Sequence, residues 1–470
     1  MLHDGLVDSG DAVLASLAPT VAFVAGRGWL RQVRHVLRKG ARSREYDAPR
    51  AMCAPPHASI VERLRPRRAA SGNRQEFHDR CILAAFFLVS VSFAPQVASS
   101  YKLLDVGPAS SLSWAVRAVA VTFGALGCAP LDLRRLRLSD VLLVSGLLIA
   151  ILQFVMAPSI SPADEALFLN GPAAAPFFIL LPLARRHVPY ARIWRLLATS
   201  VVLQLMLGIA LFFVGSPEGP QINDKNDGIV GTMGVSNMFA MLCLLVAARY
   251  AYFEDRRAFF VGFGVLGVVL SGSLAAAGCL CLIVLIGFAV DRRSRASTAK
   301  VVLLAVSGCA IYFMPFLLFG LDLPASIEHV MFKADSLWRL AIGAGSEDIS
   351  YSVTLRRQVW TDVINGVTGD MNVALFGGLG GYRYFPADSQ VVTYVGSFGL
   401  PVALLIFAPM LGCLRDLFRM RGWRFVFATL ALVLALFLLS NRMYDYFTGA
   451  ALAALVISEI RARSQGVLER

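Results

Sequence analysis

Charged residues are scarce in this chain. They make up 16% of its 470 residues, whereas a soluble domain has about a quarter, and 57% of the residues are hydrophobic. This balance excludes an ordinary soluble protein and indicates a membrane protein. The formal net charge of +13 does not indicate nucleic-acid binding, because the basic residues lie between apolar runs instead of forming one basic face.

Metal-binding and nucleotide-binding motifs are also lacking. None of the eight cysteines lies in the one long polar segment, 321–390, and neither a CxxC pair nor a Cys/His spacing occurs. The glycine pairs between Gly377 and Gly381 are not followed by Gly-Lys-Ser/Thr, which excludes a Walker loop. We therefore expect no metal ion, no cofactor and no disulfide framework.

Apolar runs fill most of the chain after Cys81 and predict an all-α polytopic membrane protein with about twelve transmembrane helices. The Ser271-Gly272-Ser273 segment either separates two spans or bends one long span, and the second option reverses the topology after it. The runs lie at about 81–97, 112–129, 141–156, 166–183, 196–214, 232–248, 259–272, 275–290, 301–320, 391–413, 424–440 and 445–460.

Arginine placement predicts the topology. Six alternate loops or ends carry most of the arginines after residue 81, at 134–137, 185–195, 249–257, 292–300, 415–424 and 461–470. By the positive-inside rule these segments face the cytoplasm. An even number of spans then places both termini in the cytoplasm of a bacterium and the polar segment outside the inner membrane.

The chain therefore divides into five parts. A basic tail, 1–80, is predicted to be disordered, or to lie on the inner leaflet through an amphipathic helix at Trp29–Arg44. The other parts are spans 1–9 at 81–320, a large external loop at 321–390 between helices 9 and 10, spans 10–12 at 391–460 and a short cytoplasmic tail at 461–470.

The external loop holds the first candidate site residues. Arg356 and Arg357 are adjacent on a segment, Thr354–Ile364, whose apolar residues, Trp360 among them, predict an amphipathic helix. Arginine binds phosphate oxygens in a bidentate manner and keeps its charge, so the pair suits a diphosphate. The alternative is a solvated helix face or a headgroup anchor.

Asp388 is the candidate general base. It stands just before a span, where partial desolvation raises the pKa of a carboxylate and improves it as a base. The alternative role for Asp388 and Ser389 is helix N-capping, and the two roles are compatible. His329 is an alternative base. Tyr382 and Tyr384 either stack on sugar rings or form an interfacial aromatic belt.

Four polar residues outside this loop are further candidates. Lys225, in a second external loop, can neutralise phosphate, and Asn237 is either a packing residue or a site residue because an intramembrane amide needs a partner. Arg442 either pairs with Asp445 or reaches the site. Arg117 lies inside the second span, where a charge is a functional suspect, although snorkelling to an interface is the simpler interpretation.

Four segments of the chain occur in a characteristic order: Gly228–Asn237 entering a span, the turn at Leu270–Ser273, Arg356 with Trp360 four residues on, and Leu375–Gly380 running into Asp388-Ser389-Gln390 and Val395–Leu400. Taken together, these segments resemble the O-antigen ligase / Wzy-type polysaccharide polymerase superfamily, and bacterial exopolysaccharide polymerases in particular, over roughly residues 81–460. Two features depart from that pattern: Asp388-Ser389 stands where ligases typically have a His, and Leu274 follows the tight turn where many members have an Arg.

The resemblance implies a metal-independent glycosyltransferase that polymerises polyprenyl-diphosphate-linked oligosaccharides at the lipid bilayer, beside a chain-length regulator and export machinery. Asp388 would activate the attacking sugar hydroxyl, and the anomeric centre would be inverted. Arg356 or Arg357, with Arg383 and Lys225, would stabilise the departing diphosphate. The alternatives are a ligase that transfers finished glycan to an acceptor, and a polysaccharide flippase or transporter.

Overall fold

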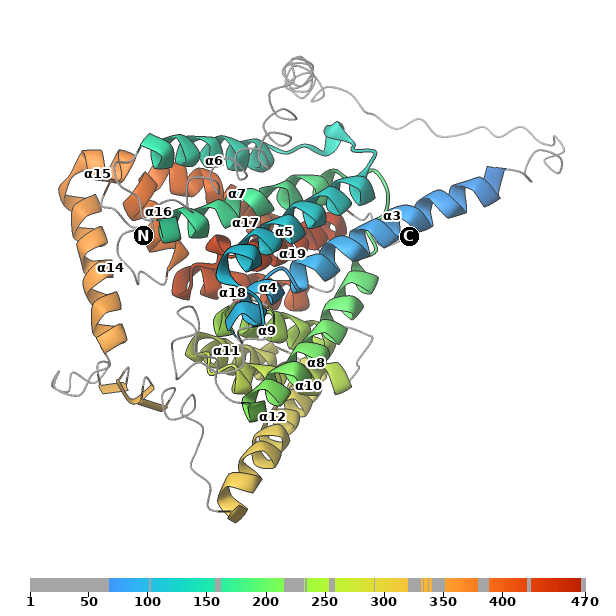
Figure 1. Ribbon diagram of the computed structural model, residues 1–470, viewed down its shortest axis with the longest axis vertical. Helices are drawn as coiled ribbons and strands as arrows, with labels where there is room; N and C mark the ends of the chain where they lie inside the picture. The colour runs from blue at the N-terminus through green and yellow to red at the C-terminus, as the bar shows by residue number, and fades with distance from the viewer. Residues whose placement is uncertain are drawn as a thin grey trace.

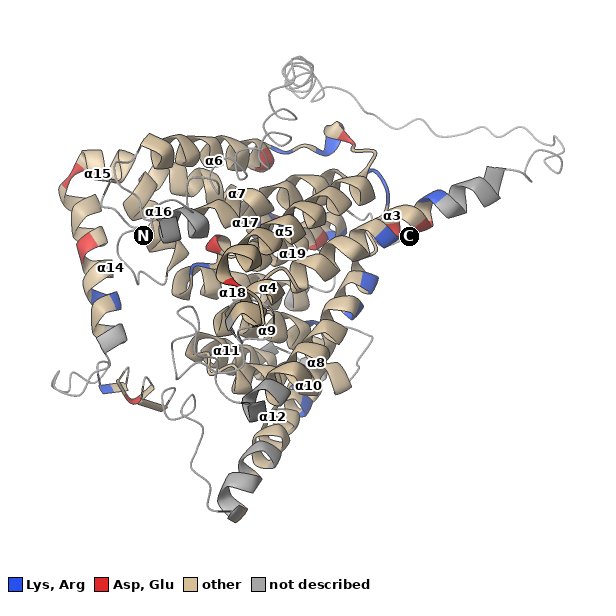
Figure 2. Ribbon diagram, viewed as in Figure 1, with Lys and Arg blue, Asp and Glu red and all other residues tan. Residues whose placement is uncertain are grey.

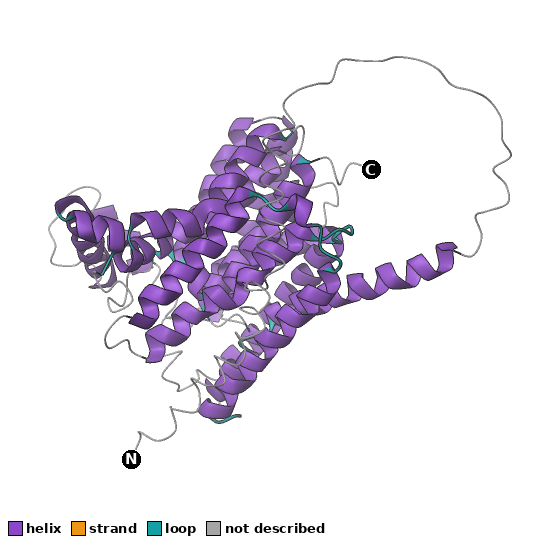
Figure 3. Cartoon of the chain, turned by 90° about the horizontal axis from the view of Figure 1, so that it is seen from above, coloured by secondary structure: helices purple, strands orange, loops and turns teal. Residues whose placement is uncertain are grey.

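The described part of the chain is helical (Figure 3). Apart from one isolated bridge between Leu131 and Ala184, its regular elements are helices, which confirms the all-α prediction. The computed structural model describes residues 67–100, 103–156, 162–214, 232, 235–252, 258–290, 292–319, 331–332, 334–336, 338–339, 351–378, 389–420 and 424–465.

Most helices coincide with the apolar runs of the sequence. They are α3 (Arg67–Ser90), α4 (Ala94–Ser100), α5 (Val106–Cys128), α6 (Leu138–Met156), α7 (Pro162–Leu183), α8 (Tyr190–Val214), α9 (Ser236–Tyr252), α10 (Ala258–Leu270), α11 (Leu274–Val290), α12 (Arg292–Phe319), α14 (Tyr351–Gly369), α15 (Met371–Phe376), α16 (Gln390–Phe398), α17 (Leu400–Arg419), α18 (Arg424–Ser440) and α19 (Phe447–Ser464). Two short 3-10 turns are η1 (Leu133–Arg135) and η3 (Met443–Asp445).

Five of the described helices are long and apolar enough to cross a membrane. They are Arg74–Ser99, Val106–Cys128, Leu138–Met156, Tyr190–Ile209 and Leu400–Arg419. Their outward faces carry exposed large apolar side chains, such as Val155 on α6 and Leu203 on α8. Water does not favour such a surface but lipid does, so these helices suggest a membrane-embedded protein. The set of twelve spans stays a prediction.

The turn at Ser271–Ser273 reverses the chain. Gly262 and Leu266 of α10 face Leu304 and Gly308 of α12 in the same order, so α10 and α12 run parallel. A single residue joins α11 to α12, and these two helices pack along each other, so they are antiparallel. Therefore α10 and α11 are antiparallel as well. Gly272, with φ +66°, supplies the left-handed conformation that the turn requires.

The predicted span at 391–413 is wrong, because the structure divides it at Gly399 into α16 and α17. Gly399 has φ +85°, and a Cβ there would collide with the carbonyl group of Leu375. Gly377 has φ +72°, and its own Cβ would collide with the backbone at Phe398. The two glycines let the turn after α15 and the turn after α16 meet, which fixes α16 as a separate short helix.

The amphipathic helix expected around Thr354–Ile364 is confirmed and extends over the whole of α14. Val359 and Val363 of α14 pack against Val392 of α16, with Trp360 beside them. In Figure 1, α14 and α15 lie at one edge of the molecule, and α3 and α8 begin at the opposite edge. The helices between these edges form the core.

Candidate functional site

Two groups of polar side chains lie within the helical core, and they differ in charge balance. The first group, the inner polar layer, joins helix ends on the side predicted to be cytoplasmic. Figure 2 shows most basic segments gathered toward this side, where α3 and α8 begin. Among the described residues, the ion pairs of this layer are Arg192–Asp79 (3.2 Å), Arg249–Glu459 (2.9 Å), Arg463–Glu459 (3.3 Å), Arg461–Asp140 (2.8 Å), Arg135–Asp132 (3.6 Å) and Arg137–Asp416.

The second group is centred on Asp445, which is fully buried in η3. One carboxylate oxygen of Asp445 accepts a hydrogen bond from Gln390 Nε2 (2.9 Å), and the other accepts one from Arg442 Nε (2.6 Å). Its backbone carbonyl accepts from Asn170 Nδ2 (2.9 Å). Asp445 therefore ties α7 and α16 to the turn between α18 and α19.

Arg117 extends this second group onto α5. Its Nη1 donates to Asn170 Oδ1 (2.6 Å), and its guanidinium lies over the rings of Phe93 (4.4 Å) and Trp114 (4.6 Å). Arg117 is 3% exposed, so its interpretation as a snorkelling residue is wrong. Among the described residues, its Nε and Nη2 have no hydrogen-bond partner, and no Asp or Glu pairs with it.

We call Arg117, Asn170, Gln390, Arg442 and Asp445 the outer polar cluster. Within it, Arg442 pairs with the carboxylate of Asp445, whereas Arg117 pairs with no described carboxylate. A buried charge without a counter-ion is costly, so the cluster is suited to an anion that supplies the missing negative charge. At 1.5 Å per residue, Arg117 lies about 16 Å along α5 from the inner polar layer, just beyond the middle of a bilayer core of about 30 Å.

Packing at α16 places Ser389 and Gln390, which follow the candidate base in the sequence, beside the outer polar cluster. Gln390 is the first residue of α16, and its Oε1 accepts from the backbone N–H groups of Tyr444 (2.7 Å) and Asp445 (3.2 Å). Ser389 caps the helix, since its Oγ accepts from the N–H of Val392 (3.3 Å). Capping by Ser389 is therefore confirmed. Asp388, which directly precedes this cap, lies outside the described residues.

The described candidates fall at three places. Arg442 pairs with Asp445, as one interpretation of the sequence predicted. Arg356 and Arg357 lie on α14 together with Trp360, and this helix packs on α16.

Asn237, at the start of α9, accepts a hydrogen bond from Ser273 Oγ (2.6 Å), which connects α9 to the turn after α10. That contact supports the packing role for Asn237. Lys225, His329, Tyr382, Arg383 and Tyr384 lie outside the described residues.

No protein-family model matches the chain. A search of curated proteins also found no match. The family resemblance therefore stays a prediction, and the site has to be judged on its own geometry. Among the residues that the structure describes, no three His, Cys, Asp or Glu side chains are grouped so that they could hold a metal ion.

Two members of the outer polar cluster were missed from the sequence. Asn170 lies inside the apolar run that became α7, and Gln390 lies at the end of the external loop. The signal for Asn170 was the same as for Arg117, a lone polar residue in an apolar span. Gln390 gave no such signal, because its contact with Asp445 joins positions far apart in the chain.

Proposed function

We propose that this chain is a membrane glycosyltransferase that polymerises polyprenyl-diphosphate-linked repeat units on the outer face of the bacterial inner membrane. One observation carries the proposal: Arg117 is buried without a carboxylate partner among the described residues, and Asn170 and Asp445 connect it to Gln390, the first residue of α16. A diphosphate leaving group is the anion that such an excess of positive charge suits.

The proposed topology has twelve spans, with both termini in the cytoplasm. Support comes from the inner polar layer, in which loops predicted to be cytoplasmic meet one another. Arg135 Nη1 donates to the carbonyl of Ala184 (2.8 Å), which joins the loop before α6 to the loop before α8. Arg461 at the end of α19 binds Asp140 at the start of α6. The α14–α16 region then faces outward.

In the proposed reaction, Asp388 takes the proton from a hydroxyl group of the incoming repeat unit. The hydroxyl oxygen attacks the anomeric carbon of the growing chain, and the bond from that carbon to the diphosphate oxygen breaks. Its electron pair stays on the diphosphate, which the arginines stabilise. A single displacement of this kind inverts the anomeric centre.

The roles of the arginines follow from their surroundings. Arg117 has two N–H groups without a described partner, so it is suited to bind diphosphate oxygens directly. Arg442 adds positive charge from its pair with Asp445. Arg356 and Arg357 on α14, with Arg383 and Lys225, would receive the diphosphate from the lipid surface. Tyr382 and Tyr384 would stack on the sugar rings.

Profiling of lipid-linked oligosaccharides tests this function. In cells that lack the gene, single repeat units should accumulate on polyprenyl diphosphate, and polymer should be absent. Full-length polymer retained on its lipid would instead identify a ligase. Complementation with the unaltered gene should restore polymer, which excludes effects on neighbouring genes.

A second function, a flippase or transporter, also has an observation in its favour. Arg117 lies near the middle of its helix, next to the turn at residues 91–93 between α3 and α4. Charges and interrupted helices near the midplane are typical of transporters. This function predicts that repeat units in the deletion strain stay on the cytoplasmic leaflet, protected from periplasmic enzymes, whereas the polymerase predicts accessible units.

A further inference from the structure

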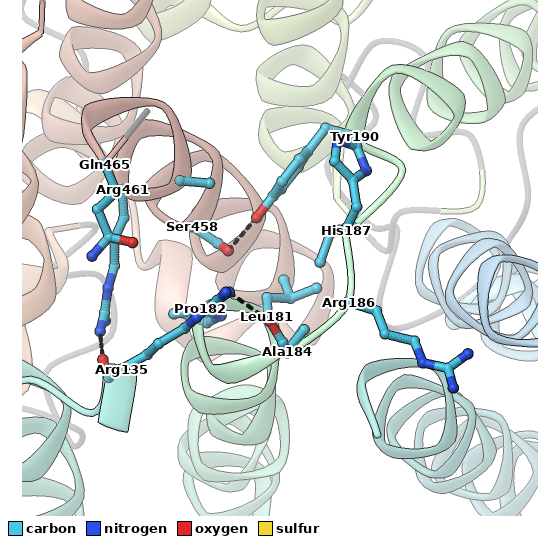
Figure 4. A pocket seen from close by; sticks show the side chains of 12 residues that line it. Arg135, Leu181, Pro182, Ala184, Arg186, His187, Tyr190, Ser458, Arg461 and Gln465 are labelled. Atoms are coloured by element: carbon cyan, nitrogen blue, oxygen red, sulfur yellow. Dashed lines mark hydrogen bonds between the residues drawn. The ribbon is translucent and has the colours of Figure 1, made fainter. Parts of the chain in front are cut away.

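An open hollow lies at the inner polar layer (Figure 4). It is formed by the loop before α6, the α7–α8 connection and the end of α19. Its floor is apolar, with Leu181, Pro182, Val188 and Ala462. Its polar lining consists of Arg135, Arg186, His187, Tyr190, Ser458, Arg461 and Gln465.

The hollow is electropositive, because three arginines line it and no aspartate or glutamate does. Figure 4 shows Arg135 reaching to the carbonyl of Ala184, and Arg186 at the rim with its guanidinium turned away from the other labelled side chains. Asp132 is 3.6 Å from Arg135 Nε, and Asp140 binds Arg461. These two carboxylates balance Arg135 and Arg461, so the positive charge that remains at the hollow is that of Arg186.

Arg461 provides a buried donor in this lining. Its Nη1 donates to both carboxylate oxygens of Asp140 (2.9 and 2.8 Å), and its Nη2 donates to the carbonyl of Arg135. Its Nε has no hydrogen-bond partner among the described residues, although Arg461 is only 5% exposed. A buried N–H group of this kind requires an acceptor.

A hydroxyl pair adds a second donor. Tyr190 and Ser458 are joined by a hydrogen bond of 2.6 Å, and both line the hollow. Whichever hydroxyl donates to the other, one hydroxyl hydrogen remains available for a ligand. Guanidinium and hydroxyl donors around one opening are the groups that bind a phosphate.

We propose that this hollow binds the phosphate headgroup of an anionic phospholipid from the inner leaflet. Its place among the predicted cytoplasmic helix ends puts it at the boundary between headgroups and acyl chains. Basic hollows between helices at this boundary hold anionic lipids, whose concentration there is high. The apolar floor suits the glycerol and first methylenes of such a lipid, which a free phosphate lacks.

Thermal unfolding of the purified full-length protein in detergent tests the proposal. Phosphatidylglycerol should raise the unfolding temperature in a saturable manner, whereas phosphatidylcholine and inorganic phosphate at equal concentration should not. Arg186→Gln and Tyr190→Phe should each require about tenfold more phosphatidylglycerol for half of the shift, as expected for the loss of one charge-assisted or buried hydrogen bond. Arg195→Gln, an exposed arginine on α8 outside the hollow, should behave like the unaltered protein.

Three outcomes would overturn the proposal. An equal shift with phosphatidylcholine would show that any lipid suffices. An equal shift with inorganic phosphate would show that the ligand is a soluble anion. An unchanged titration midpoint in both hollow variants, with normal unfolding temperatures without lipid, would place lipid binding elsewhere. None of these results depends on glycosyltransferase activity, so the proposed function stands or fails separately.

Discussion

The inner polar layer and the outer polar cluster use the same kinds of side chain, but their charges are balanced differently. In the inner layer each buried arginine pairs with a carboxylate: Arg249 with Glu459, which Arg463 also contacts, and Arg461 with Asp140. In the outer cluster Arg442 has Asp445, but Arg117 is bonded to the neutral Asn170 and pairs with no described carboxylate. Arg117 is therefore a buried positive charge without a described counter-ion, at the place where the proposed substrate binds.

This difference indicates separate roles. A matched buried pair contributes little net stability, but removal of one partner is strongly destabilising, so the inner pairs fix which helices meet. An unmatched buried arginine destabilises the fold, and a protein retains it when a ligand supplies the missing charge. The predictions below alter one side of this comparison at a time.

The largest effect is expected at Asp388, which directly precedes Ser389 in the sequence. Asp388→Asn keeps the size of the side chain but removes the base, so polymer synthesis should fall by about 100-fold to 10,000-fold. The amount of protein in the membrane should not change. Ser389→Ala is the matched control, since it removes only the cap on Val392 and costs about 1 kcal/mol of stability. Normal polymer from Asp388→Asn would remove this residue from the mechanism.

Glu459→Gln tests the inner layer. Glu459 is fully buried, and it accepts hydrogen bonds from Arg249 (2.9 Å) and from Trp194 Nε1 (2.8 Å). The variant leaves Arg249 buried without its counter-ion, so the free energy of unfolding should fall by about 3–5 kcal/mol. Thermal unfolding in detergent and the amount of protein in the membrane measure this loss.

The double variant Arg249→Met with Glu459→Met is the control for that experiment. It removes both charges and fills the space with apolar atoms, so it should be more stable than Glu459→Gln alone. A double variant that is less stable than the single one would show that the Arg249–Glu459 pair contributes to the free energy of unfolding by more than neutralising each other's charge.

Arg117→Gln should lower polymer synthesis without lowering stability, whereas Glu459→Gln lowers stability. It removes the charge that has no described carboxylate, so the unfolding temperature should stay the same or rise. Polymer synthesis should fall by about 100-fold, the usual effect of the loss of one donor to a developing negative charge. Arg117→Lys keeps the charge without the bidentate geometry and should retain part of the activity. A loss of stability as large as that of Glu459→Gln would make Arg117 an architectural residue.

The sequence was sufficient for the all-α fold class, because apolar runs are local signals, whereas the cytoplasmic side of the inner layer stays a prediction from the arginine-rich loops. The sequence also predicted an amphipathic helix at Thr354–Ile364, but not that its apolar residues pack against α16. The chain reversal at Gly272 remained open until packing against α12 showed the directions of α10 and α11. Direction depends on contacts between helices, which a single sequence does not record.

The outer cluster was predicted only in pieces. The Arg442–Asp445 pair was expected because both residues lie in one turn. The links from Asp445 to Gln390 and to Asn170 join residues more than fifty positions apart in the chain, so no spacing rule could connect them. The division of one apolar run at Gly399 was missed for the same reason, since the contact that requires this glycine comes from α15.

The smallest expected effect concerns the turn that holds α16, and through Gln390 the outer cluster. Gly399→Ala forces a side chain against the backbone at Leu375 and should lower the free energy of unfolding by about 1–3 kcal/mol. Gly378 also has a positive φ, +90°, but open space surrounds the position that a Cβ would occupy. Gly378→Ala should therefore cost only about 1 kcal/mol, from backbone conformation alone. Because Gly399→Ala also displaces α16, it should reduce polymer synthesis more than Gly378→Ala does. If the two variants lower stability and polymer synthesis equally, the close approach at Gly399 does not position the outer polar cluster.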